Sequence, residues 1–216
     1  MTNIAEQVGT YLDNDFIIRK CLFNNIISLR ALSRHLIKNL HLSEKNMDAI
    51  MSAIRRYKRD NKIEELNRLK RVFADIVIKT KDNIADVYIP KNKEMQEKLN
   101  NFSSKIDLEK GEVLRIIQAE QGIRVILDEK NLNFLSDIFA KKDIRSINKG
   151  LAEVIINFFP DAVKTPGIIS IVSSSLTSAN ICIHEIMSSA PELIIIISDK
   201  DLIKALHVLE NLRSMY

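Results

Sequence analysis

The sequence predicts an α+β protein in which an N-terminal helix-turn-helix, with or without a wing, precedes two ferredoxin-like βαββαβ modules. The first reason is charge, because residues 1–72 hold 14 Lys and Arg against 8 Asp and Glu, whereas residues 73–216 hold 18 against 20. The second is that helical patterns fill the first third, while strand and helix patterns alternate afterwards. The third is that the order strand, helix, strand, strand, helix occurs twice in the remainder. We therefore expect a helix-turn-helix domain with a connecting helix at 1–72, and modules at 73–147 and 148–216.

The composition bears on compartment and membrane association. The two cysteines, Cys21 and Cys182, are far apart in the sequence and do not suggest a disulfide framework. We therefore expect a reducing, cytoplasmic location. No basic leader and no run of 18 apolar residues occurs, so we expect neither a signal peptide nor contact with a membrane.

No arrangement of residues indicates catalysis, so we expect the protein not to be an enzyme. The five glycines form neither a GxGxxG nor a Walker A pattern, and no cofactor is expected. Cys182 and His184 could form a metal pair on one strand, but a buried or half-buried strand face is the favoured interpretation, so no metal is expected. The run Ser173–Ser175 lies in a predicted helix without a paired base and indicates a solvated face.

Three helices are expected in the N-terminal third. The segment "NDFIIRKCLFNN" begins at an Asn14/Asp15 cap, "LRALSRHLIKNL" carries a stripe of leucines, and "SEKNMDAIMSAIRRYKRDN" begins at Ser43. One face of the third helix is apolar at helical spacing, formed by Met47, Ile50, Met51, Ile54 and Tyr57. The segment "KIEELNRLKRV" is expected to be a separate connecting helix.

The opposite face of the third helix is basic. A step of 100° per residue places Lys45, Ser52, Arg56 and Arg59 there, flanked by Arg55. Two helices joined by a tight link, the second basic outside and apolar inside, are typical of a helix-turn-helix. In that motif the basic side chains neutralise phosphates, and Ser52 or Arg56 would reach base edges in the major groove. The alternative is that this face is merely solvated.

The pattern of residues in the second and third predicted helices also resembles that of a known class of protein. The run "NNIISLRALSRHLIKNL", followed by "NMDAIMSAIRRYKRD", resembles the helix-turn-helix half of archaeal-type regulators. This resemblance has no rigid signature, but it implies that double-stranded DNA is the partner of the N-terminal third.

Residues 73–216 predict the two modules. The segment "ADIVIKTKDNIADVYIP" gives two β-type runs around Lys81-Asp82-Asn83, which are either a wing or the first strands of the next domain. A helix "KNKEMQEKLNNF", a hairpin turning at Gln121-Gly122 and a helix "KNLNFLSDIFAKK" follow. The second copy consists of "GLAEVIINFF", a helix over 166–179, the strands "ICIHEIM" and "ELIIIIS", and the helix "DKDLIKALHVLENLR".

The second copy resembles a known domain. The segment "TPGIISIVSSSLTSANICIHEI", followed by "ELIIIISDKDLIKALHVL", resembles the ACT domain, in particular the paired ACT modules of the aspartokinase regulatory region. The resemblance covers roughly residues 150–213, whereas residues 83–145 resemble an ACT domain by topology only. We expect the second module to lack its last strand, because only Ser214, Met215 and Tyr216 follow the predicted final helix. We expect a strand from residues 74–89, or from a second subunit, to complete its sheet.

The turn before the helix over 166–179 is the candidate ligand site. Thr165 is expected to cap this helix, and Gly167 leaves the amides of the first turn open to a carboxylate. The resemblance implies that a small amino acid binds here, with its carboxylate against the backbone of Gly167 and Ile168. It also makes Asp161 a candidate for the ligand ammonium, and Asn180 a candidate to close the site. The alternative is that the glycine only allows helix and sheet to pack closely.

Two functions follow from these expectations. The first is an amino-acid-responsive transcription regulator that binds DNA through residues 43–60 and senses its ligand through the ACT pair, which also forms a homodimer. The alternative is a non-enzymatic ACT regulatory subunit that docks on an amino-acid biosynthetic enzyme. The basic excess favours DNA, because Lys is depleted in protein interfaces.

Overall fold

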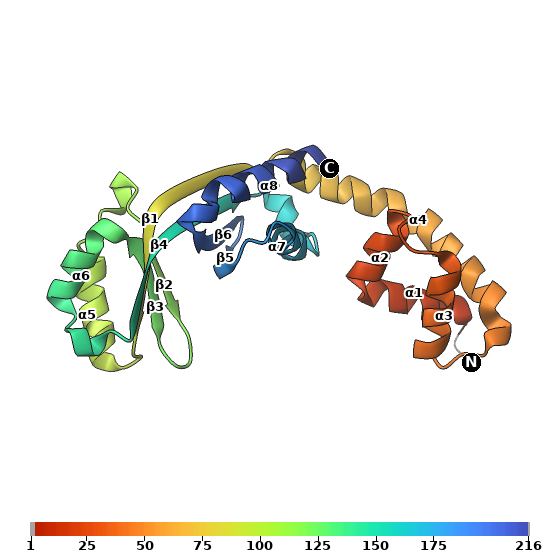
Figure 1. The fold of residues 1–216 in the computed structure, drawn as a ribbon, viewed down its shortest axis with the longest axis horizontal. Coiled ribbons are helices and arrows are strands. Elements are labelled where there is room, and N and C mark those ends of the chain that lie inside the picture. The colour runs from red at the N-terminus through yellow and green to blue at the C-terminus, as the bar shows by residue number, and fades with distance from the viewer. Residues whose placement is uncertain (1–2, 216) are drawn as a thin grey trace. The chain divides into compact units, whose positions relative to one another are not determined.

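The structure is a computed structural model that describes residues 3–215, apart from the side chains of residues 61–70, 161, 163 and 215. Contacts divide the described residues into a helical unit, which ends at Arg71 and with which Thr165–Gly167 are grouped, and a sheet unit made of Val72–Lys164 and Ile168–Met215. Figure 1 shows the course of the chain through both units.

Within the described residues, four helices belong wholly or partly to the helical unit. They are α1 (Ile4–Asn14), α2 (Phe16–Phe23), α3 (Leu29–Asn39) and α4 (Met47–Ala74), with the 3-10 turn η1 (Glu44–Asn46) before α4. The third predicted helix and the connecting helix are therefore wrong as separate elements, because they form one helix of 28 residues. No proline or glycine interrupts that segment, so the helical hydrogen bonds continue through it.

Side-chain caps fix where these helices begin. The Asp15 carboxylate accepts from the backbone N–H of Ile18 at 2.9 Å, and the Ser43 hydroxyl accepts from that of Lys45 at 3.3 Å. Both caps agree with the sequence prediction. The first helix, α1, is missing from that prediction, although Asn3 caps it and Val8 and Leu12 share its buried face.

The helical unit has its own apolar core. Its buried members come from all four helices: Val8, Leu12, Leu22, Phe23, Leu32, Leu36, Ile50, Ala53 and Ile54. The predicted apolar face of α4 is confirmed at Ile50 and Ile54, which are fully buried. Tyr57 is partly buried and stacks on Phe23, with ring centroids 6.3 Å apart.

In the described part of the sheet unit, six antiparallel strands form one sheet in the order β2-β3-β1-β4-β6-β5. The strands are β1 (Val77–Ile89), β2 (Leu114–Gln118), β3 (Ile123–Asp128), β4 (Ser146–Asn157), β5 (Ile183–Ser189) and β6 (Glu192–Ser198). The helices are α5 (Lys93–Ser103), α6 (Leu132–Ile138), α7 (Ile168–Ser178) and α8 (Leu202–Met215). Short 3-10 turns are η2 (Leu108–Lys110), η3 (Glu129–Asn131), η4 (Lys141–Asp143), η5 (Pro160–Lys164) and η6 (Asp199–Asp201). The predicted order strand, helix, strand, strand, helix is thus present twice.

The two longest strands, β1 and β4, pair with each other along almost their whole length, from Val77 opposite Asn157 to Tyr88 opposite Ser146. On one side β3 pairs only with residues 84–89 of β1, and on the other β6 pairs only with residues 151–157 of β4. The sheet therefore has a first half (β2, β3, the end of β1 and the start of β4) and a second half (β5, β6, the end of β4 and the start of β1).

This arrangement decides three expectations. The start of β1 is the strand that completes the second half, so the borrowed strand comes from residues 74–89 of the same chain. Because residues 77–89 form one strand of this sheet, the wing interpretation of the segment is wrong. The expected boundary between residues 147 and 148 falls inside β4, so the two modules share strands and are not separate domains.

The two halves repeat each other around the middle of the sheet. Asn83 in β1 and Gly150 in β4 both have a positive φ, of 54° and 67°, and the register of the β1–β4 pair shifts next to them. Three residues after each, an otherwise apolar run of the strand carries a buried acid, Asp86 or Glu153. The internal repetition therefore includes a bulge and an acid as well as the topology.

Helices cover one face of each half (Figure 1). In the first half α5 and α6 pack on β1 and β3 through buried residues that include Phe102, Leu135 and Val125. In the second half α7 and α8 lie together, with Val172 and Leu209 fully buried. The opposite faces of the two halves share a separate apolar cluster made of Ile84, Val113, Ile126, Leu151, Ile194 and Ile196.

Candidate functional site

The predicted DNA-contacting residues are all solvent exposed. Lys45 lies in η1, and Ser52, Arg55, Arg56 and Arg59 lie on α4. On a helix, positions 52, 55, 56 and 59 fall within one side because residues three or four apart are neighbours. This face therefore combines three guanidinium groups with one hydroxyl.

Four of these residues also line an open hollow of about 680 Å³ in the helical unit. Ser52, Arg55, Arg56 and Arg59 form its α4 side, and Asn3, Ile4 and Ala5 form the side provided by the first turn of α1. We call this feature the arginine hollow. Lys45 is not part of its lining. The sequence prediction placed the arginines on one face, but it did not include α1, which turns that face into a hollow.

A second polar cluster in the helical unit is structural. The Tyr57 hydroxyl donates to Asp13, and the Arg19 guanidinium donates to the Asp13 backbone carbonyl at 3.2 Å. Burial, together with this hydrogen bond to Asp13, raises the pKa of Tyr57 to about 12. These hydrogen bonds connect α4 with α1, and α1 with α2.

Among the predicted ligand residues that the structure describes, Ile168 and Asn180 are not brought together. Helix α7 begins at Ile168, two residues later than expected, so Thr165 and Pro166 lie in the preceding turn instead of the helix start. Ile168 is the first residue of this helix of 11 residues, which is roughly 16 Å long at 1.5 Å per residue, and Asn180 follows its other end. One small amino acid cannot bridge them, so Asn180 does not close a site at Ile168. The Asp161 side chain lies outside the described residues.

The backbone conformation at position 167 explains why a glycine occupies it. Its φ of 92° lies in the left-handed region, which glycine adopts without steric cost. Thr165 is buried, and Gly167 is half-buried. Asn180 also has a positive φ, of 54°, and its N–H donates to the Thr177 carbonyl at 2.8 Å, which ends α7. The glycine is therefore required by the turn, whatever binds there.

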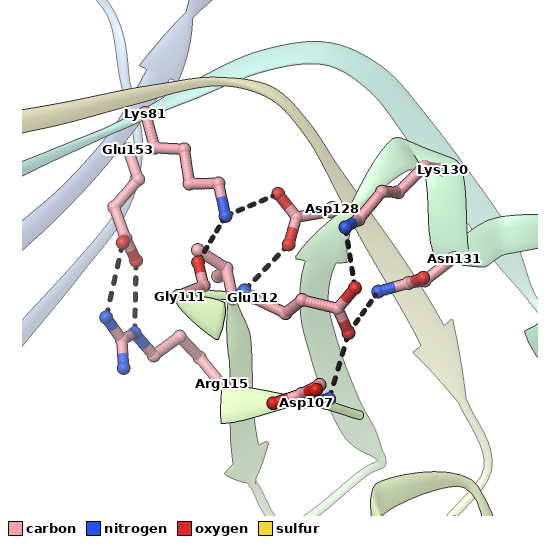
Figure 2. Close-up of polar contacts among 10 residues, drawn as sticks. Lys81, Asp107, Gly111, Glu112, Arg115, Asp128, Lys130, Asn131 and Glu153 are labelled. Atoms are coloured by element: carbon pink, nitrogen blue, oxygen red, sulfur yellow. Dashed lines mark hydrogen bonds and ion pairs between the residues drawn. The ribbon is translucent and has the colours of Figure 1, made fainter. Parts of the chain in front are cut away.

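The sheet unit contains an ionic cluster around two buried acids that sequence reasoning missed. Its first part is the pair Arg115–Glu153, in which Nε and Nη2 of the guanidinium reach the two carboxylate oxygens at 3.1 and 3.2 Å (Figure 2). The Glu153 side chain is 1% exposed, and that of Arg115 is 32% exposed. Such bidentate geometry is the strong form of a charge-assisted hydrogen bond.

The second part is centred on Asp86, which is fully buried. Its Oδ2 atom accepts from Arg124, contacts His184 Nε2 at 2.9 Å and accepts from Asn148 Nδ2 at 3.3 Å. Arg124 also approaches Glu185, with Nε 3.7 Å from Oε2. We call the residues Arg115, Glu153, Asp86, Arg124 and His184 the ionic seam.

The seam shows that the sheet is curled. Arg115 on the edge strand β2 reaches β4, and His184 on the other edge strand β5 reaches β1. Each pair of strands is three positions apart in the sheet, which is roughly 14 Å in a flat sheet with strands 4.8 Å apart. Direct contact across that separation requires both edges to fold over the centre. The seam therefore ties the first half to the second half on both sides.

A further polar network lies beside the seam, where β1 passes from one half to the other (Figure 2). Lys81 Nζ lies 2.8 Å from Asp128 Oδ1, and Asp128 Oδ2 accepts from the backbone N–H of Val113 at 2.7 Å. Next to it, Glu112 pairs with Lys130 at 2.6 Å and accepts from the backbone N–H of Asp107 at 3.0 Å. The network fixes the loop before β2 and the start of α6.

The network shifts the pKa of its members. The Lys130 ammonium and the Asp107 backbone N–H lower the pKa of Glu112 to about 2. The hydrogen bond that Lys130 donates to Glu112 in turn raises the pKa of Lys130. On the outer side of the first half, Lys98 lowers the pKa of Asp143, with the nitrogen 2.7 Å from the carboxylate.

The structure places Cys182 and His184 in different surroundings. Cys182 is exposed and precedes β5, whereas His184 contacts Asp86. Among the residues that the structure describes, no group of three or more His, Cys, Asp or Glu side chains could hold a metal ion. None of the helices in the described part of the chain is long and apolar enough to cross a membrane.

No protein-family model matches the sequence, and no curated protein matches it. Solved structures match it by fold. Aspartate kinase from Clostridium acetobutylicum superposes with a TM-score of 0.52 and 17% identity over 64% of this chain and 34% of that chain. A chain from a structure of aspartokinase alpha and beta subunits gives 0.51 and 16% over 62% and 95%. The regulatory subunit of aspartate kinase from Thermus flavus gives 0.50 and 16% over 62% and 95%.

The fold is of the ACT type. The expected resemblance to aspartokinase regulatory domains is therefore confirmed at the level of fold. This chain spans about a third of the clostridial enzyme, and at these identities the similarity concerns the fold alone. The helix-turn-helix of the N-terminal third stays a prediction.

One sequence signal could have located the ionic seam. Asp86 stands in the apolar run "IADVYI" and Glu153 in the run "LAEVII", at matching positions of the two ACT-type halves. A charged residue inside a core strand is rare unless it is paired. The partners could not be found in the same way, because Arg115 and His184 come from the opposite edges of the sheet.

Proposed function

We propose that this protein is a non-enzymatic regulator in which the helical unit binds double-stranded DNA and the ACT-type sheet unit binds a small amino acid. The observation that carries the proposal is the exposed face of α4, where Arg55, Arg56 and Arg59 gather in the part of the chain that holds its excess positive charge. A positive surface of this kind attracts a polyanion and accelerates its binding.

The ACT-type fold supports the regulatory half of the proposal. The clostridial aspartate kinase, which shares this fold, is an allosteric enzyme. A ligand can change DNA binding only if it binds one arrangement of the protein more tightly than another, with a typical coupling of about 1–3 kcal/mol. The turn at Gly167 and Ile168 is the proposed ligand position, and a homodimer is the proposed assembly that places two helical units on one DNA.

A second candidate function rests on a different observation. The match to the Thermus flavus regulatory subunit covers 95% of that chain, so this chain contains an ACT-type unit of the size of a complete regulatory subunit. In that case the protein would dock on a biosynthetic enzyme, and the helical unit would be the docking domain.

Titration of the full chain with fluorescent genomic duplex fragments tests the proposal. We expect binding whose log K falls linearly with log salt, and whose affinity changes when a mixture of the twenty amino acids is added. An affinity for DNA that does not change when the mixture is added would indicate a DNA-binding protein that does not respond to amino acids. No binding at low salt would reject DNA as the partner and favour the docking subunit.

A further inference from the structure

We infer that the arginine hollow holds a phosphate group, clamped between the guanidinium groups of α4 and the first turn of α1. The inference deepens the proposed DNA binding and rests on it for the source of the phosphate, which is either the DNA backbone or a small phosphorylated ligand. It adds α1 to the binding surface. It also changes the role expected for Ser52 and Arg56 from contacting base edges to contacting phosphate.

The charge of the lining supports an anion. None of the residues that line the hollow is acidic, whereas three of them are arginines. Among the residues that the structure describes, Arg55 and Arg56 have no carboxylate partner, and Arg59 contacts only the neighbouring Asp60, with Nε 3.0 Å from Oδ1. Three guanidinium groups around one open space repel one another unless an anion lies between them. Arg also suits phosphate because its planar fork donates two parallel hydrogen bonds.

The start of α1 supplies the opposite wall. This helix has 11 residues, and its N-terminal end carries a partial positive charge of roughly half an elementary charge. Asn3 and Ile4, at the beginning of α1, and Ala5 line the hollow opposite the arginines. The Asn3 side chain accepts from the backbone N–H of Ala5 at 3.1 Å, so it holds the first turn in place beside the hollow. Positive potential therefore comes mainly from the arginines, with a smaller contribution from the end of α1, where Glu6 lies outside the lining and offsets part of the helix dipole.

The shape of the surface favours phosphate over base edges. A side chain that reads bases has to project from a helix lying in a groove about 8.5 Å deep. Ser52 and Arg56 instead line a recess that they share with α1, and they do not stand on an unobstructed ridge. A recess of this kind suits a group that protrudes from its partner, as a phosphate does on nucleic acid. The contact then positions the protein on DNA and carries no sequence information.

DNA binding by single variants of the full chain tests the inference. Arg55→Ala and Arg56→Ala each remove one of the guanidinium groups that neutralise the phosphate. At about 0.1 M salt each should weaken binding about 8-fold and reduce the slope of log K against log salt by about 0.9. The loss should be the same on three duplexes of unrelated sequence. The matched controls are Arg30→Ala and Arg34→Ala on α3, which are exposed, remove the same charge and do not line the hollow. They should change binding less than two-fold.

A further variant, Asn3→Asp, tests the α1 wall. Asp caps a helix as well as Asn does, so the fold is retained while a negative charge enters the hollow. We expect it to weaken binding at least as much as loss of one arginine. A second measurement uses inorganic phosphate as the probe. The backbone amide signals of residues 4–6 should shift with sodium phosphate but not with sodium chloride of equal ionic strength, and the shift should disappear in Arg55→Ala.

The outcomes separate this inference from the proposed function. DNA binding that falls equally in the hollow variants and the α3 controls would overturn the hollow and leave DNA binding in place. Losses that differ between the three duplexes would also overturn it, because they would indicate base reading. Phosphate binding without DNA binding would reject DNA as the partner and support a small phosphorylated ligand. If neither binds, both are rejected.

Discussion

Replacing Arg115 with Met tests whether the ionic seam holds the two halves of the sheet together. The substitution leaves the Glu153 carboxylate, 1% exposed, without its bidentate partner. Removing one partner of a buried pair typically costs about 3–5 kcal/mol. Because the Arg115 side chain is 32% exposed, water can approach the remaining carboxylate. We therefore expect the lower value, a loss of about 3 kcal/mol in the free energy of unfolding.

Hydrogen exchange in the full chain is the suitable assay, because it reports on each unit separately. A loss of about 3 kcal/mol accelerates exchange of the most protected β3, β4 and β6 amides by about 150-fold, at 1.36 kcal/mol per factor of ten. Amides of α2 and α3 should not change, because they belong to the helical unit. The double variant Arg115→Met/Glu153→Leu should recover most of the protection, since apolar residues often replace a buried pair without loss.

The control is Lys110→Ala, which removes a pair with Asp107 whose side chains are 82% and 41% exposed. An exposed pair of this kind contributes at most about 1 kcal/mol, so protection should change little. Two results would refute the reasoning: Arg115→Met with the same small effect as the control, or a double variant whose loss equals the sum of the single losses.

Three further predictions concern pKa and packing. Because the pKa of Glu112 is about 2 in the folded protein and 4.5 ordinarily, its stabilising effect is complete above about pH 4.5 and is lost as the pH falls towards 2. Acid unfolding of Glu112→Gln, followed by circular dichroism, should therefore depend less on pH in this range. Ultraviolet titration should show a tyrosine step near pH 12 that Tyr57→Phe abolishes. Gly122→Ala should destabilise the sheet unit by about 1–3 kcal/mol in a thermal melt, because a Cβ there overlaps the Tyr88 ring.

Each of these predictions has an outcome that contradicts it. If the acid-unfolding curve of Glu112→Gln matches that of the unaltered protein, Lys130 and the Asp107 amide do not stabilise the ionised Glu112 carboxylate. A late tyrosine step that survives in Tyr57→Phe would assign it to another residue. For Gly122→Ala, the control is Gln121→Ala at the neighbouring exposed position, and equal melting temperatures would mean that the Tyr88 ring moves aside at no cost.

The sequence predicted only one part of the arginine hollow, the basic face of α4. The arginines of α4 follow from helical periodicity, which depends on residues within two turns of one another. The hollow did not follow, because it needs α1, whose helix propensity is lowered by Gly9 and which packs against α4 from about 50 residues away in the sequence. A site made by two helices is a property of their packing, which no single helix pattern contains.

The sequence by itself determined the local elements: the caps at Asp15 and Ser43, the order of strands and helices, and the repeated ACT-type topology. These depend on side-chain hydrogen bonds and periodicities that span a few residues. Only the tertiary structure decided that β1 serves both halves of the sheet, and that Arg115 and His184 cross from the edges to buried acids near the centre. Strand pairing and sheet curl join residues far apart in the chain, and their register is set by the packing of whole faces, so no local pattern encodes them.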